Sequence, residues 1–326
     1  MPAIPRQAWE SFWRAALALA MCAPVLAHAW PDKPLRFVVP YAPGGVIDTA
    51  ARILQPGLGE VLGQPIVIEN RSGASGNIGA EAVARAPKDG QTFLVANEAI
   101  AINPLIFRST PFDLYKDFTP VGKLADFPSV MVVHPTVPAN SVGEFVALAR
   151  SKPGQLSFGS AGVGTTSHLA GELLQSMTGI ELTHVPYKGG APAMNDLLAG
   201  NIQSMFLSVL LTAPQARTGK LKPLAVLGRA RVQQLPQVPT IAEAGFAEIQ
   251  VMVFAALLAP QGIPQVAVQG MNAATWTVLR SGDTARKLAE LGGIPAPSTP
   301  AELTEIFRRE NQIWSRVIHE HNIHAD

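Results

Sequence analysis

The sequence predicts an α/β protein of two lobes that are joined by crossover strands, with a ligand cleft between them. Short apolar strands alternate with helical patterns along most of the 326 residues, which is typical of βαβ units and a largely parallel sheet. Two longer apolar segments, Ser129–His134 and Ile249–Ala259, stand apart, and a proline follows each. No low-complexity linker divides the chain, so paired crossover strands are favoured over separate tandem domains.

The first 29 residues predict a cleaved secretory signal peptide. Arg6 and Arg14 precede an apolar run over residues 15–27, which is too short to span a bilayer as a helix. The run ends in Ala27-His28-Ala29, a small-x-small cleavage pattern. We expect the mature chain to begin at Trp30 in the periplasm, with a retained membrane anchor as the alternative.

The cysteine content and the net charge exclude several modifications and partners. Cys22 is the only cysteine, and it follows Met21 where lipoprotein processing prefers a small residue, so we expect neither a lipid nor a disulfide. The chain has 25 Lys and Arg against 24 Asp and Glu, and removal of Arg6, Arg14 and Glu10 leaves 23 of each. The absence of a basic stripe argues against nucleic acid as a partner, and we expect a monomer.

The N-terminal part of the chain predicts three strands and two helices in alternation. The strands cover 35–39, 65–69 and 92–96, and the helices cover 48–62 and 79–86. Pro56 and the nearby glycines weaken the first of these helices. This part and residues 250–326 form lobe 1 over 30–130 plus 250–326, and residues 131–249 form lobe 2.

Capping patterns mark later helix starts, namely Ser141-x-x-Glu144, Thr240-x-x-Glu243 and Thr299-x-x-Glu302. The last helix has an apolar stripe that includes Leu303 and Trp314, which indicates core packing. Where the chain crosses between lobes, we expect a hinge near Asp126–Ser129 and Glu248–Val251.

Four polar or glycine-rich loops follow predicted strands, at 41–48, 71–79, 159–168 and 187–190. Ligands of open α/β sheets bind at such positions, where glycines permit close approach and helix N-termini direct N–H groups at the ligand. Some alternatives remain open. Asp48 is either a helix N-cap or an acceptor for ligand or water, the hydroxyls of 165–167 either cap a helix or bind a carboxylate or phosphate, and Lys188 is either a solvated turn residue or a cation for the ligand.

Catalysis has little support in the sequence. It contains no Gly-x-Ser-x-Gly elbow, and nothing identifies a carboxylate that would orient His168. His319-x-His321-x-x-His324 has loose metal-like spacing at the C-terminus, where we expect no metal site. We therefore expect no enzyme, no cofactor and no catalytic residue. A hydrolase or transferase that uses the loop Gly162–His168 and a periplasmic sensor module remain as alternatives.

Several motifs, in a fixed order along the chain, are typical of one protein family. They are Val39-Pro40-Tyr41-x-x-Gly44-Gly45-x-x-Asp48, Glu69-Asn70-Arg71-x-Gly73-Ala74-x-Gly76-Asn77-Ile78-Gly79, Gly164-Thr165-Thr166-Ser167-His168, His184-Val185-Pro186-Tyr187-Lys188-Gly189 and Leu235-Pro236-x-Val238-Pro239-Thr240. With these motifs the mature chain resembles the tripartite tricarboxylate transporter receptors, the Bug family of periplasmic solute-binding proteins.

The resemblance implies a type II periplasmic binding fold that holds a carboxylate in its cleft and delivers it to membrane permease subunits. By motif, the ligand-binding residues are Tyr41, Ala42, Gly45, Asp48, Gly76, Asn97, Gly164, Thr165, Thr166, His168, Tyr187 and Leu207. Leu207 departs from the polar or acidic residue that amino-acid-binding members often have there. We therefore expect an organic acid without an ammonium group.

Overall fold

The computed structural model describes residues 30–320 apart from 250 and 291. The predicted signal peptide, with Cys22 and the cleavage pattern, lies outside the described residues, as do His321 and His324.

The strands and helices alternate through most of the described chain, as the sequence predicts. The strands are β1 (Leu35–Val39), β2 (Ile66–Asn70), β3 (Thr92–Ala96), β4 (Phe118–Val133), β5 (Ser157–Ser160), β6 (Thr183–Pro186), β7 (Ser204–Ser208), β8 (Lys222–Val226), β9 (Met252–Pro260) and β10 (Ile294–Pro295). The helices are α2 (Val46–Leu62), the 3-10 turn η1 (Ala74–Gly76), α3 (Asn77–Ala84), α4 (Ala99–Ile106), α5 (Leu114–Asp117), α6 (Val142–Ser151), α7 (Thr166–Thr178), α8 (Gly190–Leu198), α9 (Val209–Arg217), α10 (Gln265–Arg280), α11 (Gly282–Glu290) and α12 (Pro300–Glu320).

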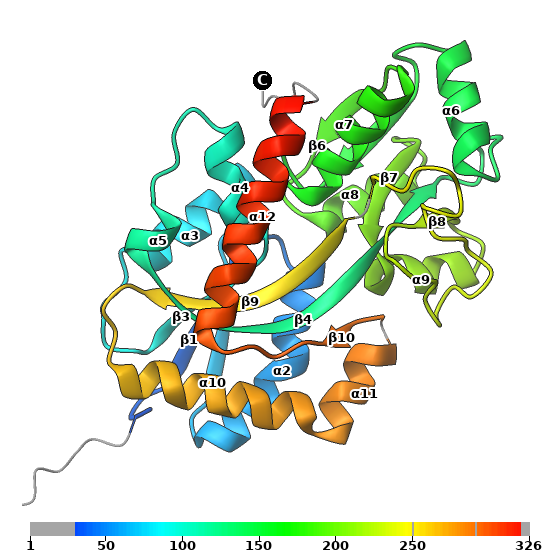
Figure 1. The fold of residues 1–326 in the computed structure, drawn as a ribbon. Helices are drawn as coiled ribbons and strands as arrows, with labels where there is room; N and C mark the ends of the chain where they lie inside the picture. Colours follow the sequence, from blue (N-terminus) through cyan, green and yellow to red (C-terminus); the bar gives the residue numbers. More distant parts are fainter. Residues whose placement is uncertain (1–29, 250, 291, 321–326) are drawn as a thin grey trace, which may run out of the picture.

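The strands form one continuous sheet in the order β2-β1-β3-β9-β4-β7-β5-β6, with β8 and β10 also paired to β4. The neighbours β2, β1 and β3 are parallel, and so are β7, β5 and β6. Between these two parallel groups lie β9 and β4, which run antiparallel to each other and to their neighbours. Each parallel group therefore builds one lobe, and β4 and β9 connect the lobes (Figure 1).

The long strand β4 changes partners where the sequence places a crossover. Its residues Phe118–Pro128 pair with β9, and Ser129–Val133 pair with β7. On this basis we propose the lobe limits predicted above, lobe 1 as 30–130 plus 250–326 and lobe 2 as 131–249.

Each lobe has its own apolar core. In lobe 1, Phe37, Phe93 and Leu54 pack with Val278 of α10 between the sheet and the helices α2 and α10. In lobe 2, Phe145, Phe158, Leu169 and Phe206 form the corresponding cluster. Full burial of a Phe or Leu side chain contributes about 1.5–3 kcal/mol, so both lobes have enough core to hold the loops between them in place.

The C-terminal helix α12 spans the two lobes. Leu303 and Phe307 are buried in a cluster of lobe 1, whereas Trp314 and Ile318 are buried with Ile249 and Val251 against lobe 2. Figure 1 shows α12 running past the crossover strands toward lobe 2. The apolar stripe therefore packs as core, but its two halves serve different lobes.

The predicted capping hydrogen bonds form, but helices follow only Ser141 and Thr299, where α6 and α12 begin. Residues 241–245 form turns, so the helix start predicted at Thr240 is wrong. The hydroxyls of Ser141, Thr240 and Thr299 each accept a hydrogen bond from the backbone N–H three residues later. None of the helices over the described residues combines the length and the hydropathy needed to cross a bilayer.

Candidate functional site

A cavity lies between the lobes, next to the crossover strands. Both lobes contribute to its wall. The lining residues are Tyr41, Gly45, Val46, Ile47, Asn97, Ala161, Thr165, Thr166, Ser167, Gly190, Phe206, Leu207, Ser208, Leu211 and Val253.

Four helices begin at this cavity, one from lobe 1 and three from lobe 2. Their N-cap residues are Gly45 for α2, Thr165 for α7, Gly189 for α8 and Ser208 for α9, and no N-cap side chain hydrogen-bonds to its own helix. The first N–H groups of a helix have no partner within the helix, and they carry about half a positive charge. Four such ends around one cavity form a site suited to an anion.

No side chain that lines the cavity is charged, because the lining contains no Asp, Glu, His, Lys or Arg. Lys188 is exposed and lies outside the lining, which agrees with the solvated turn residue among its two alternatives. Attraction for an anion therefore comes from backbone N–H groups and from neutral hydroxyls and amides.

A buried hydrogen-bond chain links the two lobes at the wall of the cavity. The Tyr41 hydroxyl donates to Asn97 Oδ1 at 2.9 Å, and Asn97 Nδ2 lies 3.4 Å from Glu98 Oε1. From lobe 2, the Thr166 hydroxyl donates to the same Glu98 oxygen at 2.9 Å. The backbone N–H of Phe254 in β9 donates to Glu98 Oε2 at 3.1 Å.

Glu98 is fully buried, and burial raises the pKa of its carboxyl to about 8. Burial also raises the pKa of the Tyr41 hydroxyl, and the nearby Glu98 adds to that shift. These raised pKa values favour the neutral form of both groups at pH 7.

The two lobes also touch through their backbones. The Ala42 N–H of lobe 1 donates to the Lys188 carbonyl of lobe 2 at 3.2 Å. A Cβ on Gly189 would lie 3.3 Å from the Ala42 nitrogen, at a φ of +130° that favours glycine. Together with the bond between Thr166 and Glu98, these contacts define a closed arrangement of the cleft.

Asp48 holds the first loop together and does not line the cavity. Its carboxylate accepts hydrogen bonds from Gly44 N at 2.8 Å, Arg52 Nε at 2.8 Å and Asn70 Nδ2 at 2.9 Å. Burial acts to raise the pKa of Asp48, but these hydrogen bonds outweigh it and lower the pKa below its usual value. The N-cap of α2 is Gly45, so the N-cap alternative for Asp48 is wrong. Asp48 lies in the first turn and reaches back to the loop N–H.

His168 and Tyr187 make their hydrogen bonds within lobe 2 and do not line the cavity. His168 Nδ1 accepts from the Gly164 N–H at 3.2 Å, and its ring stacks on His184 with 4.2 Å between centroids. Burial, with a smaller effect of His168, lowers the pKa of His184 to about 3. The Tyr187 hydroxyl donates to Asp196 Oδ2 at 2.6 Å.

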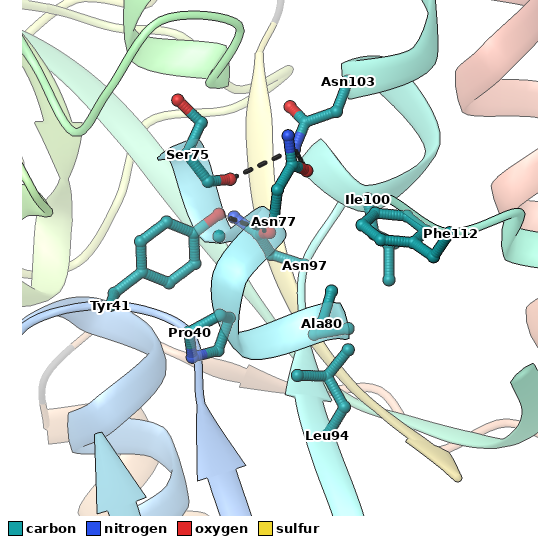
Figure 2. A pocket seen from close by; sticks show the side chains of 12 residues that line it. Pro40, Tyr41, Ser75, Asn77, Ala80, Leu94, Asn97, Ile100, Asn103 and Phe112 are labelled. Carbon is teal, nitrogen blue, oxygen red and sulfur yellow. Dashed lines mark hydrogen bonds between the residues drawn. The ribbon is translucent and has the colours of Figure 1, made fainter. Parts of the chain in front are cut away.

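A smaller pocket lies within lobe 1, beside Tyr41 (Figure 2). Gly76 lines this pocket, and Tyr41 and Asn97 line both it and the larger cavity. Asn103 Nδ2 donates to Asn77 Oδ1 at 2.6 Å and to the Ser75 carbonyl at 3.2 Å, as Figure 2 shows for the Ser75 contact. Asn103 Oδ1 has no hydrogen-bond partner there, but this pocket is the smaller of the two and its lining comes from lobe 1 alone, so the larger cavity between the lobes is the candidate site.

The structure therefore separates the predicted residues into two groups. Tyr41, Gly45, Asn97, Thr165, Thr166 and Leu207 line the cavity. Ala42, Asp48, Gly76, Gly164, His168 and Tyr187 lie outside its lining.

Sequence reasoning missed nine lining residues: Val46, Ile47, Ala161, Ser167, Gly190, Phe206, Ser208, Leu211 and Val253. Five of these directly follow or precede a predicted residue, and Ala161 and Gly190 lie in the predicted loops 159–168 and 187–190. Only Leu211 and Val253 carry no such signal beyond their apolar character.

A two-lobed α/β fold with an anion-suited cavity between its lobes defines a solute-binding protein. The sequence profile of the tripartite tricarboxylate transporter family receptor matches residues 50–323, and the chain belongs to that family of periplasmic solute receptors. This finding confirms both the predicted family and the predicted fold class.

Three relatives illustrate the similarity. The chain is 33% identical to Protein BugT from Bordetella pertussis over 302 residues, which cover 92% of this chain and 93% of that protein. An R. palustris protein solved with adipate has a TM-score of 0.88 and 36% identity, over 90% of this chain and 99% of that one. MatC from Rhodopseudomonas palustris, solved with bound malate, has a TM-score of 0.84 and 32% identity, over 89% of this chain and 100% of that one.

Proposed function

We propose that this protein is a non-enzymatic periplasmic receptor that captures a small organic acid and delivers it to the membrane subunits of a tripartite tricarboxylate-type transporter. The observation that carries this proposal is the meeting of four helix N-termini, without side-chain caps, at one uncharged cavity. The relatives solved with adipate and malate support a carboxylate as the ligand class.

The available donors are sufficient for useful affinity. Micromolar binding corresponds to about 8 kcal/mol. A hydrogen bond to a charged group contributes about 1.5–3 kcal/mol, and a helix N-terminus adds about 0.3–1 kcal/mol. Four to six N–H and hydroxyl donors therefore reach that range after the cost of ordering the ligand is included.

An ammonium group on the ligand is disfavoured by the same lining. The cavity presents no carboxylate of its own. Glu98 lies next to it, but its pKa, raised to about 8, favours the neutral acid at pH 7, and its two oxygens already accept from Thr166 and Phe254. A buried cation without a charged partner is costly, so amino acids should bind more weakly than the matching acids.

Binding without turnover agrees with the side chains at the cavity. Among the lining residues the only titratable side chain is Tyr41, and burial raises its pKa further from neutrality. A general acid or base with a pKa near the working pH is therefore missing from the wall.

Export is part of the proposal, with Trp30 as the first mature residue, and N-terminal sequencing of periplasmic protein tests it.

Calorimetry with matched ligands tests the proposed function. Each acid of a panel is compared with its neutral amide and with its amino-substituted analogue, at pH 7. We expect the acid to bind at least tenfold more tightly than either analogue. Equal binding of the amide, or tighter binding of the amino acid, would contradict the proposal.

A variant pair tests the role of the helix N-termini. Val46→Pro removes one N–H at the first position of α2, where proline is tolerated, and the preceding Gly45 is already extended at φ −74° and ψ 171°. Val142→Pro makes the same change at the start of α6, away from the cavity. Val46→Pro should weaken acid binding about tenfold, and Val142→Pro should leave it unchanged.

A further inference from the structure

The cavity wall has one polar side chain without a hydrogen-bond partner. Tyr41 donates to Asn97, and Asn97 in turn lies against Glu98. The other hydroxyls of the wall are engaged as well: Thr165 donates to the Gly162 carbonyl, Thr166 to Glu98, and Ser167 accepts from the Ala161 N–H. Among the described residues of the lining, only Ser208 has a buried polar side-chain atom, its Oγ, without a partner.

The position of Ser208 makes this lone hydroxyl informative. Ser208 is only 3% exposed, and it is the N-cap of α9, where serine commonly accepts a hydrogen bond from its own helix. Its side chain makes no such bond. A buried hydroxyl that satisfies neither its helix nor a neighbour costs free energy unless a ligand or water completes it. Ser208 pairs with Ser129 across the crossover strand β4, so its backbone is fixed in place.

Most of the remaining wall is apolar. Lobe 1 contributes Val46, Ile47 and Val253, and lobe 2 contributes Phe206, Leu207 and Leu211. The start of α8 faces two of these side chains, because a Cβ on Gly190 would lie 3.3 Å from Leu207 Cδ2 and 3.3 Å from Leu211 Cδ1. A ligand with a second carboxylate would have to place it beside Leu207 and Leu211, where it would lose its hydrating water. The lining contains no Lys or Arg to compensate for that loss.

We propose that the ligand is a monocarboxylate with an apolar body, and that the Ser208 hydroxyl together with the N-terminus of α9 binds its polar end. This inference rests on the proposed function and narrows the ligand class. The hydrocarbon part fills the space between the apolar side chains of the two lobes, where its burial is favourable. The Ser208 hydroxyl donates to a carboxylate oxygen beside the positive end of α9.

Three matched pairs of acids test the ligand class by calorimetry on the mature protein at pH 7. The pairs are hexanoate with adipate, benzoate with terephthalate, and 3-methylbutanoate with methylsuccinate, and each differs by one carboxylate. We expect the monocarboxylate to bind at least tenfold more tightly in every pair that binds. Equal or tighter binding of the dicarboxylates overturns the inference but leaves the proposed function intact. If none of the six acids binds, both are overturned.

Two variants test the role of Ser208. Ser208→Ala and Thr212→Val each remove a buried hydroxyl without a partner from α9 or its cap, but only Ser208 lines the cavity. Both variants should unfold at the same temperature as the wild type or higher, because removal of an unsatisfied polar atom is neutral or stabilising. Ser208→Ala should weaken binding of the preferred monocarboxylate about ten- to a hundredfold, and Thr212→Val should leave it unchanged. Binding by Ser208→Ala within twofold of the wild type overturns the assignment.

Discussion

Replacement of Glu98 by glutamine should remove a pH dependence from the folding stability of this receptor. Burial raises the pKa of Glu98 to about 8 from an ordinary value of 4.5. The folded protein therefore holds this proton more tightly than the unfolded chain. The stabilisation is complete below the unfolded pKa and is lost as the pH rises through about 8. Each pH unit in between changes the free energy of unfolding by about 1.4 kcal/mol, so the wild type should lose about 3 kcal/mol between pH 5.5 and 7.5 relative to the variant.

Glutamine is a suitable replacement because it resembles the protonated acid. Its Oε1 can accept from the Phe254 N–H, and its Nε2 can donate to the Thr166 hydroxyl. Only the longer contact from Asn97 Nδ2, at 3.4 Å, is lost. Two other titratable groups face Glu98. The pKa of Glu310 in α12 is raised by burial, and so is that of Tyr41. Both residues are present in the wild type and the variant, so their contributions largely cancel in the difference.

Urea unfolding at pH 5.5, 6.5, 7.5 and 8.5, followed by tryptophan fluorescence at constant ionic strength, measures the effect. The difference in unfolding free energy between wild type and Glu98→Gln should change steadily up to about pH 8 and level off above it. Glu60→Gln changes an exposed carboxyl of α2 and should follow the wild type at every pH. Parallel curves for the wild type and Glu98→Gln would refute the reasoning.

Three further predictions follow from the structure. Asp48→Asn should lower the unfolding free energy by about 1–3 kcal/mol at pH 7 in urea titrations, because its charged hydrogen bonds hold the first loop. Since the pKa of Asp48 is lowered, this difference should vanish as the pH falls through that pKa, and no difference at pH 7 would contradict it. Gly171→Ala should destabilise by about 1–3 kcal/mol in thermal unfolding, because its Cβ would lie 2.2 Å from Phe158 Cε2, whereas the exposed Gly143→Ala should be neutral or stabilising. Small-angle scattering should show a smaller radius of gyration with ligand than without it, and identical radii with binding proven would exclude hinge closure.

The architecture was largely readable from the sequence because it depends on pattern and length. Apolar strands that alternate with helices predict the parallel groups, and the longer segments near Ser129 and Ile249 coincide with the points where the chain passes between lobes. The sequence does not predict that the two halves of α12 pack against different lobes. Trp314 and Leu303 belong to one amphipathic stripe, and the pattern that predicts their burial does not say which core receives each of them.

The sequence predicts which loops form the site, but it predicts only some of the residues that line the cavity. Glycines and helix starts identify the segments that reach the cleft, and Gly45, Thr165 and Thr166 line it. Polar side chains in those segments could equally bind their own loop, which is what Asp48 and His168 do. The direction of such a side chain is set by neighbours distant in sequence, such as Asn70 for Asp48.

The contacts that join the lobes differ in what an opening motion would do to them. Trp314 and Ile318 of α12 pack beside Ile249 and Val251, at the crossover itself, where a rotation about the hinge displaces atoms least. The Thr166 hydroxyl meets Glu98 at the wall of the cavity, where the same rotation separates the lobes. We therefore expect opening to leave α12 packed and to admit water to Glu98, which would lower its pKa toward the ordinary value. We expect such a receptor to release a proton as it opens at neutral pH, so that by linkage its closed, ligand-bound form is favoured when the pH falls.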